Sequence, residues 1–547
     1  MELMSPIDAL FLSAESREHP LHVGALQLFE PPAGAGRGFV RETYQAMLQC
    51  REIAPLFRKR PTSLHGALIN LGWSTDADVD LGYHARRSAL PAPGRVRELL
   101  ELTSRLHSNL LDRHRPLWET HVIEGLRDGR FAIYSKMHHA LVDGVSGLTL
   151  MRQPMTTDPI EGKLRTAWSP ATQHTAIKRR RGRLQQLGGM LGSVAGLAPS
   201  TLRLARSALI EQQLTLPFGA PHTMLNVAVG GARRCAAQSW PLDRVKAVKD
   251  AAGVSLNDVV PVSYTHLRAH ETPEHLVCRL LLEKNRQHHV VEADPGRVFH
   301  RLDPVQRPGL RGAAPRSPDG DIEHGVRARR CAAQSWPLDR VKAVKDAAGV
   351  SLNDVVLAMC AGALREYLDD NDALPDTPLV AMVPVSLRTD RDSVGGNMVG
   401  AVLCNLATHL DDPADRLNAI HASMRGNKNV LSQLPRAQAL AVSLLLLSPA
   451  ALNTLPGLAK ATPPPFNVCI SNVPGAREPL YFNGARMVGN YPMSLVLDGQ
   501  ALNITLTSTA DSLDFGVVGC RHSVPHVQRV LSHLETSLKE LERAVGL

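Results

Sequence analysis

Two adjacent histidines in the segment KMHHALVDGVSG, residues 136–147, are the side chains of this chain best suited to acid–base chemistry. His138 and His139 are followed by Asp143 and Gly144. A neutral imidazole, with an ordinary pKa of about 6.5, can take a proton from a hydroxyl or a thiol at neutral pH. A turn ending at Gly144 could aim such a ring, and Asp143 could hold the turn. The pattern is therefore compatible with a general base.

Two other interpretations of the histidine pair compete with catalysis. Adjacent side chains on a strand point in opposite directions, and no cysteine or third histidine lies near His138 and His139, so a metal site is disfavoured. The pair could also satisfy buried backbone groups, which is the default interpretation for two arbitrary histidines. These residues alone leave the catalytic and the structural interpretations open.

The elements around the pair predict how it is positioned. RPLWETHVIEGL (115–126) and GRFAIYSKMHHA (129–140) read as the two strands of a hairpin, so the histidines fall where the second strand ends. GVSGLTLMRQ (144–153) begins a helix. The rest of the chain mixes both types, with strands expected at 22–30, 378–388, 466–475, 493–510 and 513–519, and helices at 94–112, 351–370, 416–434 and 524–544.

A perfect internal duplication interrupts this pattern. Residues 232–260 are identical to residues 328–356, and the segment 261–285 between them resembles translated sequencing-adapter sequence. Residues 286–326 are rich in Arg, Pro, Gly and His without apolar periodicity. We hypothesise that the insert is an assembly artefact. We expect the second copy to pack natively, because it continues into the helical pattern LAMCAGALREYL, and the first copy and insert to form an exposed, irregular excursion.

Length and composition set the class of protein. With 547 residues and 44% hydrophobic residues, more than one domain is expected. The net charge of +9 suits an acidic ligand or an anionic lipid surface, and 4% aromatic residues give little support to nucleic-acid binding. The basic run at 177–183 reads as a solvated face. The apolar stretch at 437–455 is too short to span a bilayer and reads as a buried helix or a lipid-dipping surface.

The chain also predicts a cytoplasmic protein. None of its eight cysteines forms a C-x-x-C pair, and the N-terminus has no basic start followed by a long apolar run. The domains expected are 1–152, an N-terminal domain with the histidine motif; 153–222, a crossover; 223–327, the first copy with the insert; and 328–547, a C-terminal domain.

Several motifs in fixed order resemble the bacterial wax ester synthase/diacylglycerol acyltransferase family. HHALVDG matches its HHxxxDG motif, PLW lies at Pro116, Leu117 and Trp118, and ND lies at Asn353 and Asp354 with a duplicate at Asn257 and Asp258. Further blocks are MSPIDALFL with HPLHVGAL, VDLGYHARRSALPAPG, VPVSLR, GGNMVG and SNVPG. The resemblance covers 1–231 and 328–547, and it departs at 261–327.

The resemblance implies a mixed α/β fold of two chloramphenicol acetyltransferase-like, CoA-dependent domains with a tunnel between them. By that match His139 is the general base that deprotonates the hydroxyl of a diacylglycerol or a long-chain alcohol, which then attacks the acyl-CoA thioester. Acyl-CoA is a cosubstrate, and no metal or other cofactor is needed. His138 would support the loop and Asp143 would be structural. Contact with the inner membrane or lipid inclusions would deliver the oily substrates.

Outside the histidine motif, the same resemblance assigns supporting roles. Asn353 and Asp354 either cap the helix at 355–368 or shape the tunnel in the second domain. We expect Arg388 to pair with Asp143 across the two domains. The PLW segment is expected to pack rather than react, since Pro116 and Leu117 carry no acid or base.

Two other functions remain open. Condensation domains and plant-type acyltransferases share an HHxxxDG or HxxxD centre, and DFGVVG (514–519) resembles in part the plant-type DFGWG motif, so the acceptor could differ. The chain could also be a non-catalytic or misfolded lipid-binding member of the fold. Copurified lipid without release of CoA would favour that alternative.

Overall fold

The computed structural model of the chain describes residues 2–63, 70–160, 164–170, 219–230, 233–235, 332–386, 399–432, 464–476, 478–509 and 512–546. The chain divides into two compact units, Met1–Ser239 with Ala328–Leu547, and Trp240–Arg327. Only residues of the first unit are described. Several features predicted from the sequence lie outside them: Arg388, Asn257 and Asp258, the basic run 177–183, the apolar stretch 437–455 and the insert 261–327.

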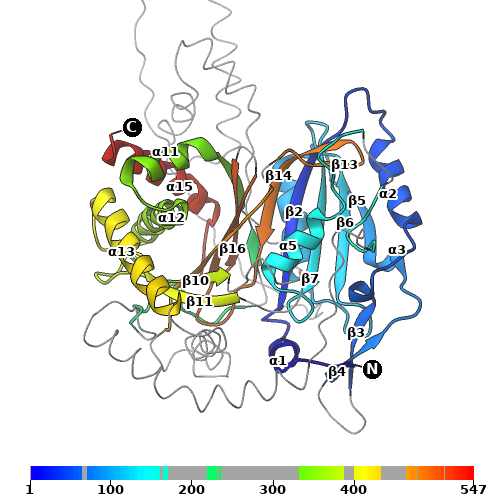
Figure 1. Cartoon of the computed structure of the whole chain (residues 1–547), viewed down its shortest axis with the longest axis horizontal. Helices are drawn as coiled ribbons and strands as arrows, with labels where there is room; N and C mark the ends of the chain where they lie inside the picture. The colour runs from blue at the N-terminus through cyan, green and yellow to red at the C-terminus, as the bar shows by residue number, and fades with distance from the viewer. Residues whose placement is uncertain are drawn as a thin grey trace, which may run out of the picture. The chain divides into compact units, whose positions relative to one another are not determined.

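A six-stranded sheet carries the histidine motif. Its order is β13-β14-β2-β7-β6-β5, and only the β5–β6 pair is parallel. Helix α4 covers one face, and α2 and α5 pack against the other; Figure 1 shows α5 across β2 and β7. The bounds are β2 His22–Glu30, β5 Ala85–Ala89, β6 Trp118–Glu124, β7 Phe131–His138, β13 Tyr481–Phe482, β14 Ala485–Met493, α2 Phe39–Gln49, α4 Val96–Ser108 and α5 Gly144–Arg152.

The side chains of β7 point alternately to the two faces of the sheet, and both faces are covered by helices. Phe131, Ile133 and Met137 enter the cluster under α2 and α5, whereas Ala132 and Tyr134 enter the cluster under α4. A strand covered by helices on both faces reads as nearly continuous apolar sequence. The predicted β6–β7 hairpin is confirmed, and both strands lie within the predicted segments, each ending two residues before the predicted end.

A smaller sheet is formed by strands near the N-terminus of the chain. Strands β1, β4 and β3 form a three-stranded sheet in that order. Helix α1 begins after Ser5, whose hydroxyl accepts the Asp8 N–H, and this cap stops the chain from continuing as a strand. The bounds are β1 Glu2–Leu3, α1 Pro6–Ala14, η1 Pro55–Arg58, β3 Lys59–Ser63, β4 Asn70–Thr75 and α3 Leu81–His84.

The second large sheet has the order β11-β10-β12-β15-β16-β8, and β9 also pairs with β16. Helices α11, α12, α13 and α15 gather on one side of it (Figure 1) and share its largest hydrophobic core. The bounds are β8 Arg233–Cys235, β9 Ala332–Pro337, α11 Leu338–Ala348, α12 Leu352–Asp369, β10 Val380–Ser386, β11 Val399–Asn405, α13 Pro413–Ser432, β12 Val468–Val473, β15 Leu502–Ser508, β16 Ser512–Cys520 and α15 Gln528–Ala544.

The two large sheets exchange a strand, which the sequence did not predict. Strands β13 and β14 follow β12 in the chain, yet β14 pairs with β2 in the first sheet. The predicted strand at 493–510 is wrong in its first half, because β14 ends at Met493 and β15 begins only at Leu502. Between them the chain turns at Gly499, whose positive φ of 76° breaks an extended run.

The edge strand beside β16 is assembled from both copies of the duplication. Cys235 of β8 pairs with Val518, and Ala332 of β9 pairs with the next residue of β16, Val517. Ala332 is the repeat equivalent of residue 236, so β9 continues the register of β8 without a shift. The expectation that the first copy is exposed and irregular is therefore wrong for Arg233–Cys235, which supply three residues of this edge. The second copy supplies the rest, followed by α11 and α12.

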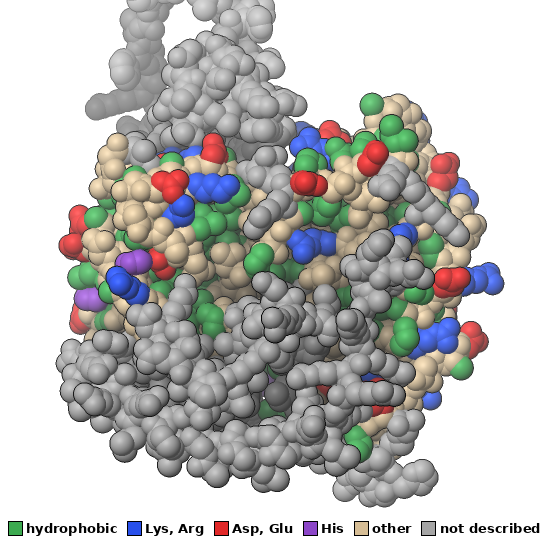
Figure 2. All heavy atoms as spheres, viewed as in Figure 1, with side chains coloured by type: hydrophobic (Ala, Val, Ile, Leu, Met, Phe, Trp, Pro, Cys, Tyr) green, Lys and Arg blue, Asp and Glu red, His purple; other side chains and the backbone are tan. Residues whose placement is uncertain are grey.

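No single helix among the described residues is long and apolar enough to cross a membrane. Helices α11 and α12 reach that length only as a pair, across a bend of 104°. On the face shown in Figure 2, basic and acidic side chains are interspersed among hydrophobic ones over the described surface.

Candidate active site

The histidine pair sits in a tight turn that is fixed by backbone hydrogen bonds on both sides. The His138 N–H donates to Leu117 O at 3.0 Å, and the His139 N–H donates to Leu21 O at 2.9 Å. The turn closes where the Leu141 N–H donates to His138 O at 2.9 Å. The prediction that the histidines lie where β7 ends and a loop begins is confirmed.

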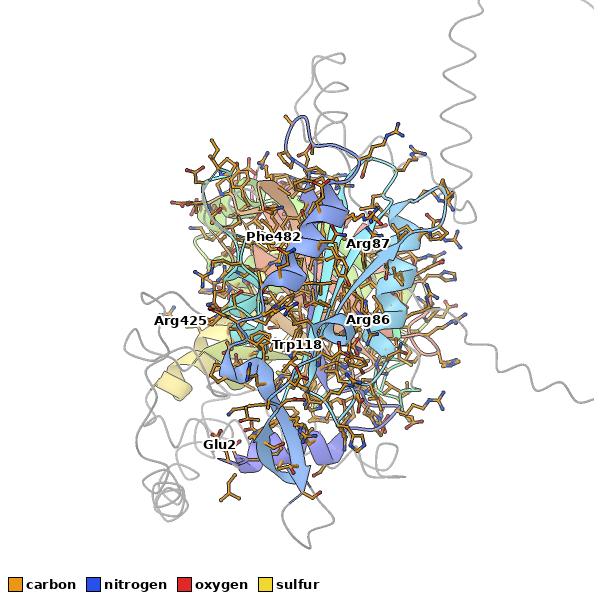
Figure 3. All side chains as sticks on the ribbon, turned by 90° about the vertical axis from the view of Figure 1, so that its right-hand side faces the viewer. Glu2, Arg86, Arg87, Trp118, Arg425 and Phe482 are labelled. Atoms are coloured by element: carbon orange, nitrogen blue, oxygen red, sulfur yellow. The ribbon has the colours of Figure 1, made fainter. Side chains whose placement is uncertain are left out.

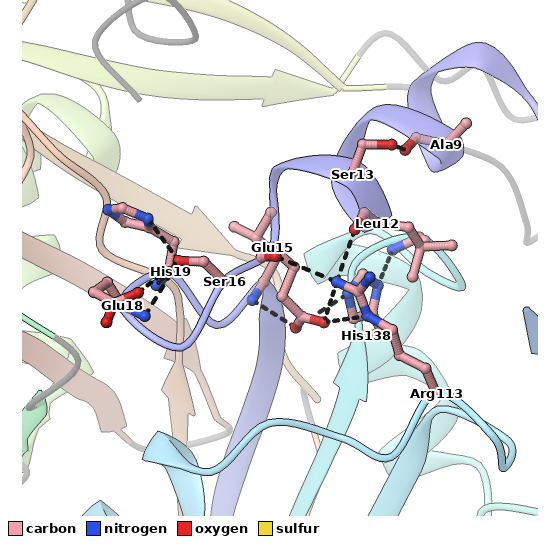
Figure 4. Close-up of polar contacts among 11 residues, drawn as sticks. Ala9, Leu12, Ser13, Glu15, Ser16, Glu18, His19, Arg113 and His138 are labelled. Carbon is pink, nitrogen blue, oxygen red and sulfur yellow. Dashed lines mark hydrogen bonds and ion pairs between the residues drawn. The ribbon is translucent and has the colours of Figure 1, made fainter. Parts of the chain in front are cut away.

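His138 is fully buried and bonded within the turn. The Ala140 N–H donates to its Nδ1 at 3.0 Å, so this nitrogen is the acceptor and the proton of the neutral ring sits on Nε2. Nε2 lies 3.3 Å from Glu15 Oε1 (Figure 4). No hydrogen bond of good geometry reaches Nε2 in the described part of the chain, so the contact with Glu15 is electrostatic; it places the ring beside the end of α1, which suits a supporting role for His138.

Glu15 is a buried carboxylate with several partners. Its Oε1 accepts the Leu21 N–H at 3.2 Å, and its Oε2 accepts from Arg113 Nη2 at 3.1 Å and Nε at 3.3 Å. Burial alone would raise the pKa of Glu15, but the contacts with His138, Leu21 and Arg113 outweigh it and hold the pKa below its usual value. The carboxylate is therefore charged and balanced by Arg113.

His139 has a different environment. Its ring stacks on Phe11, with centroids 4.4 Å apart and an interplanar angle of 23°. Its Nδ1 is buried, and no residue in the described part of the chain hydrogen-bonds to it. Burial lowers the pKa of His139 to about 4, against the opposing charge of Asp143 and with a smaller contribution from His138. At neutral pH the ring is uncharged and can accept a proton.

Asp143 and Gly144 start the helix that follows the turn. Asp143 is the N-cap of α5, and its Oδ1 accepts the Ser146 N–H at 2.7 Å. A methyl group added at Gly144 would meet no atom within 4 Å among the described residues. Asp143 therefore fixes the helix start. Its predicted partner Arg388 lies outside the described residues, so that pairing stays a prediction.

The PLW segment holds the turn from the β6 side. Leu117 is fully buried with Leu12 and Ala140, and its carbonyl is the acceptor for His138. Trp118, labelled in Figure 3, donates from Nε1 to Phe57 O at 2.9 Å and stacks on His84 and Trp168, at centroid distances of 4.5 Å and 5.3 Å. Pro116 is buried beside them.

The ND pair lies at the start of α12, in the second sheet's helical layer. Ser351 is the N-cap, and its hydroxyl accepts the Asp354 N–H while an Asp354 oxygen accepts the Ser351 N–H, which makes a capping box. Asp354 also contacts His421 Nδ1 of α13 at 2.9 Å. Capping is thus performed by Ser351 with Asp354, and Asn353 lies in the first turn, inside the helix.

A buried polar layer lies under α4, on the same side of the sheet as His138. Lys136 is fully buried and donates to Leu106 O at 2.9 Å and Asn109 O at 2.7 Å, at the end of α4. Burial lowers the pKa of Lys136 to about 8, and Glu119, 3.8 Å away, opposes this. These contacts anchor α4 to β7 two residues before the histidines.

The described residues include no group of three or more His, Cys, Asp or Glu that could hold a metal. The arrangement instead offers one neutral, partly buried imidazole in a rigid turn, which suits proton transfer. Sequence reasoning missed Glu15, Phe11 and Arg113. The only available signal was the N-terminal block MSPIDALFL, because Glu15 and Arg113 are far apart in the chain and have no motif spacing.

Comparisons with known proteins show which family the chain is similar to. A profile described as the wax ester synthase/diacylglycerol acyltransferase catalytic domain matches residues 4–260 and 291–356, and the WS/DGAT C-terminal domain matches 395–542. A Mycobacterium tuberculosis (strain H37Rv) protein named as a candidate diacylglycerol O-acyltransferase is 82% identical over 544 residues, covering both chains fully. A second candidate from the same strain is 50% identical over 550 residues, again with full coverage of both.

Solved structures give the same fold. The wax ester synthase/diacylglycerol acyltransferase from Marinobacter aquaeolei VT8 aligns over the whole of both chains, with 33% identity and a TM-score of 0.66. A starter condensation domain of rhizomide synthetase, solved with C8-CoA, aligns over all of this chain and 95% of its own, with 12% identity and a TM-score of 0.50, which shows the fold alone. The predicted mixed α/β acyltransferase fold is confirmed, and the chain belongs to the wax ester synthase/diacylglycerol acyltransferase family.

Proposed function

We propose that the protein transfers a long acyl chain from acyl-CoA to the hydroxyl of a diacylglycerol, or of a long-chain alcohol, with His139 as the general base. The observation that carries the proposal is the state of this ring. It is neutral, its Nδ1 has no partner among the described residues, and it is held in a turn whose backbone is bonded on both sides.

The reaction needs one proton to move twice. His139 takes the proton of the acceptor hydroxyl while the hydroxyl oxygen forms a bond to the thioester carbonyl carbon. The carbon–sulfur bond then breaks, and the imidazolium returns the proton to the departing CoA sulfur. The products are an ester and CoA with a free thiol, so atoms and charges balance without a covalent acyl-enzyme.

Diacylglycerol is the first acceptor to test, because the two Mycobacterium tuberculosis relatives carry that activity in their names. The fatty alcohol remains in the proposal because the matching family profile names both activities. Contact with the inner membrane or with lipid inclusions would bring either acceptor to the site, and it is part of the same proposal.

The test measures CoA-thiol release from palmitoyl-CoA, with diacylglycerol or hexadecanol as acceptor. The unmodified chain should release CoA only when an acceptor is present, and His139→Ala should abolish release. His114→Ala, at an exposed loop histidine, is the matched control and should behave like the parent. An active His139→Ala protein would refute the mechanism. Lipid that copurifies with a chain unable to release CoA would instead favour the non-catalytic alternative.

A further inference from the structure

The last turn of α1 contacts both histidines of the motif. Phe11 stacks on the His139 ring, and Glu15, four residues later, lies 3.3 Å from His138 Nε2. A spacing of four residues places two side chains on the same side of a helix. Glu15 is the C-cap of α1, so the contact falls where the helix ends and the chain turns toward β2.

The Glu15 carboxylate is held in place by an ion pair with Arg113. The Glu15 side chain is fully buried (0% exposed), and the guanidinium of Arg113 balances it from a half-exposed position. Arg113 Nη2 also donates to Leu12 O at 2.8 Å and Glu15 O at 3.3 Å, which satisfies carbonyls left open at the end of α1 (Figure 4). A single cation thus fixes both the helix end and the carboxylate.

The Phe11 side chain restrains the His139 ring through packing. The aromatic face covers one side of the His139 ring, so that the imidazole cannot tilt toward α1. Leu12, the neighbouring residue, is buried against Leu117 and Ala140, and it fixes the height of α1 over the turn. The two histidines are therefore restrained separately, one by a carboxylate and one by an aromatic ring, from the same helical turn.

We propose that Phe11 and Glu15 form a clamp that positions the catalytic turn: the charge of Glu15, 3.3 Å from Nε2, favours the Nε2–H form of His138, whose Nδ1 holds the Ala140 N–H, and Phe11 fixes the plane of the His139 ring. The proposal rests on the proposed function, in which His139 is the base. Phe11 and Glu15 are positioning residues, since they act on the reaction through the two histidines.

The test compares kcat and KM for palmitoyl-CoA in the full chain. Glu15→Gln keeps the size of the side chain and removes its charge, and Phe11→Leu removes the ring. Each should lower kcat on the order of 10- to 100-fold, the scale of a misplaced catalytic group, with KM changed by less than about twofold. Phe11→Tyr keeps the stacking ring and should restore most of kcat.

Two exposed neighbours provide matched controls. Glu18→Gln makes the same chemical change in the following loop, and Leu10→Ala truncates a residue of α1 that is 57% exposed. Both should keep the parent kcat. If Glu15→Gln does not fold, Arg113→Gln, which removes the partner charge from a half-exposed position, takes its place with the same expected loss of kcat.

The outcomes separate this proposal from the proposed function. Full kcat in Glu15→Gln and Phe11→Leu, beside an inactive His139→Ala protein, would overturn the clamp and leave the base assignment standing. A loss that appears only in KM, or equally in the controls, would also overturn the clamp. Activity in His139→Ala would remove the base assignment itself.

Discussion

The duplication makes a prediction that compares one substitution in two identical sequence contexts. Val341 of α11 is fully buried in the core of the second sheet, and its repeat twin Val245 lies outside the described residues. We predict that Val341→Ala destabilises the protein and that Val245→Ala does not. The local sequence is the same in both variants, so any difference reports which copy occupies the core.

The size of the effect follows from burial. Val341→Ala removes two methyl groups, and at about 0.8 kcal/mol per buried carbon this costs about 1.6 kcal/mol. Incomplete closure of the cavity raises the expected loss to about 2–3 kcal/mol. Urea denaturation followed by tryptophan fluorescence would measure it as a lower midpoint with an unchanged slope.

The first copy of the repeat should not be able to take the place of the second copy in the core of the Val341→Ala variant. In the second copy Val356 is followed by Leu357, and α12 continues through a buried run to Asp369. In the first copy the equivalent Val260 is followed by Pro261, which cannot continue a helix and costs about 3 kcal/mol inside one. Equal destabilisation by the two alanine variants, or a larger loss from Val245→Ala, would refute this assignment.

Three further predictions follow from the same structure. Deleting residues 236–331 should preserve folding and activity and raise stability by up to about 4 kcal/mol, the closure entropy of a flexible loop of that length; an unfolded product would contradict the continuous register of β8 and β9. Because burial lowers the pKa of His139 to about 4, kcat/KM should persist as the pH falls below 6.5 and be lost only near that lower value, and a midpoint at 6.5 would contradict the burial. Gly475→Ala places a Cβ 1.5 Å from Ser508 O and should cost about 1–3 kcal/mol in thermal denaturation, whereas Gly36→Ala, in open space, should cost nothing.

Local periodicity predicted much of the fold. The β6–β7 hairpin, the strand β2 and the helices α4, α12 and α15 lie where alternation or helical spacing placed them, because each buries a face that the sequence marks as apolar. The transfer of β14 to the first sheet was not predictable in this way. Pairing between β14 and β2 joins residues far apart in the chain, and a strand's pattern does not say which neighbour it will have.

The residues of the candidate site also differ in whether sequence patterns indicate them. His138, His139 and Asp143 could be proposed from the sequence because they are close together and form a motif. Glu15 and Phe11 were missed because their role exists only after α1 has packed on the turn, and neither carries a spacing that refers to the histidines. Distant contacts that complete a local motif are the part of a site that sequence patterns describe least.

The electrostatics of the site constrain how the proton moves. The charges of Glu15 and Arg113 cancel, so they give little support to an imidazolium at His139, and burial makes that cation acidic. A base with a pKa of about 4 cannot fully deprotonate an alcohol, whose acidity is close to that of water at about 15.7, before attack begins. In the proposed reaction, the proton therefore moves while the carbon–oxygen bond forms. In the proposed reaction the same low pKa favours the second transfer, because a thiolate of pKa about 8.5 is the stronger base and takes the proton from the imidazolium. The electrostatics of the candidate site therefore favour, in the proposed reaction, release of CoA as the thiol.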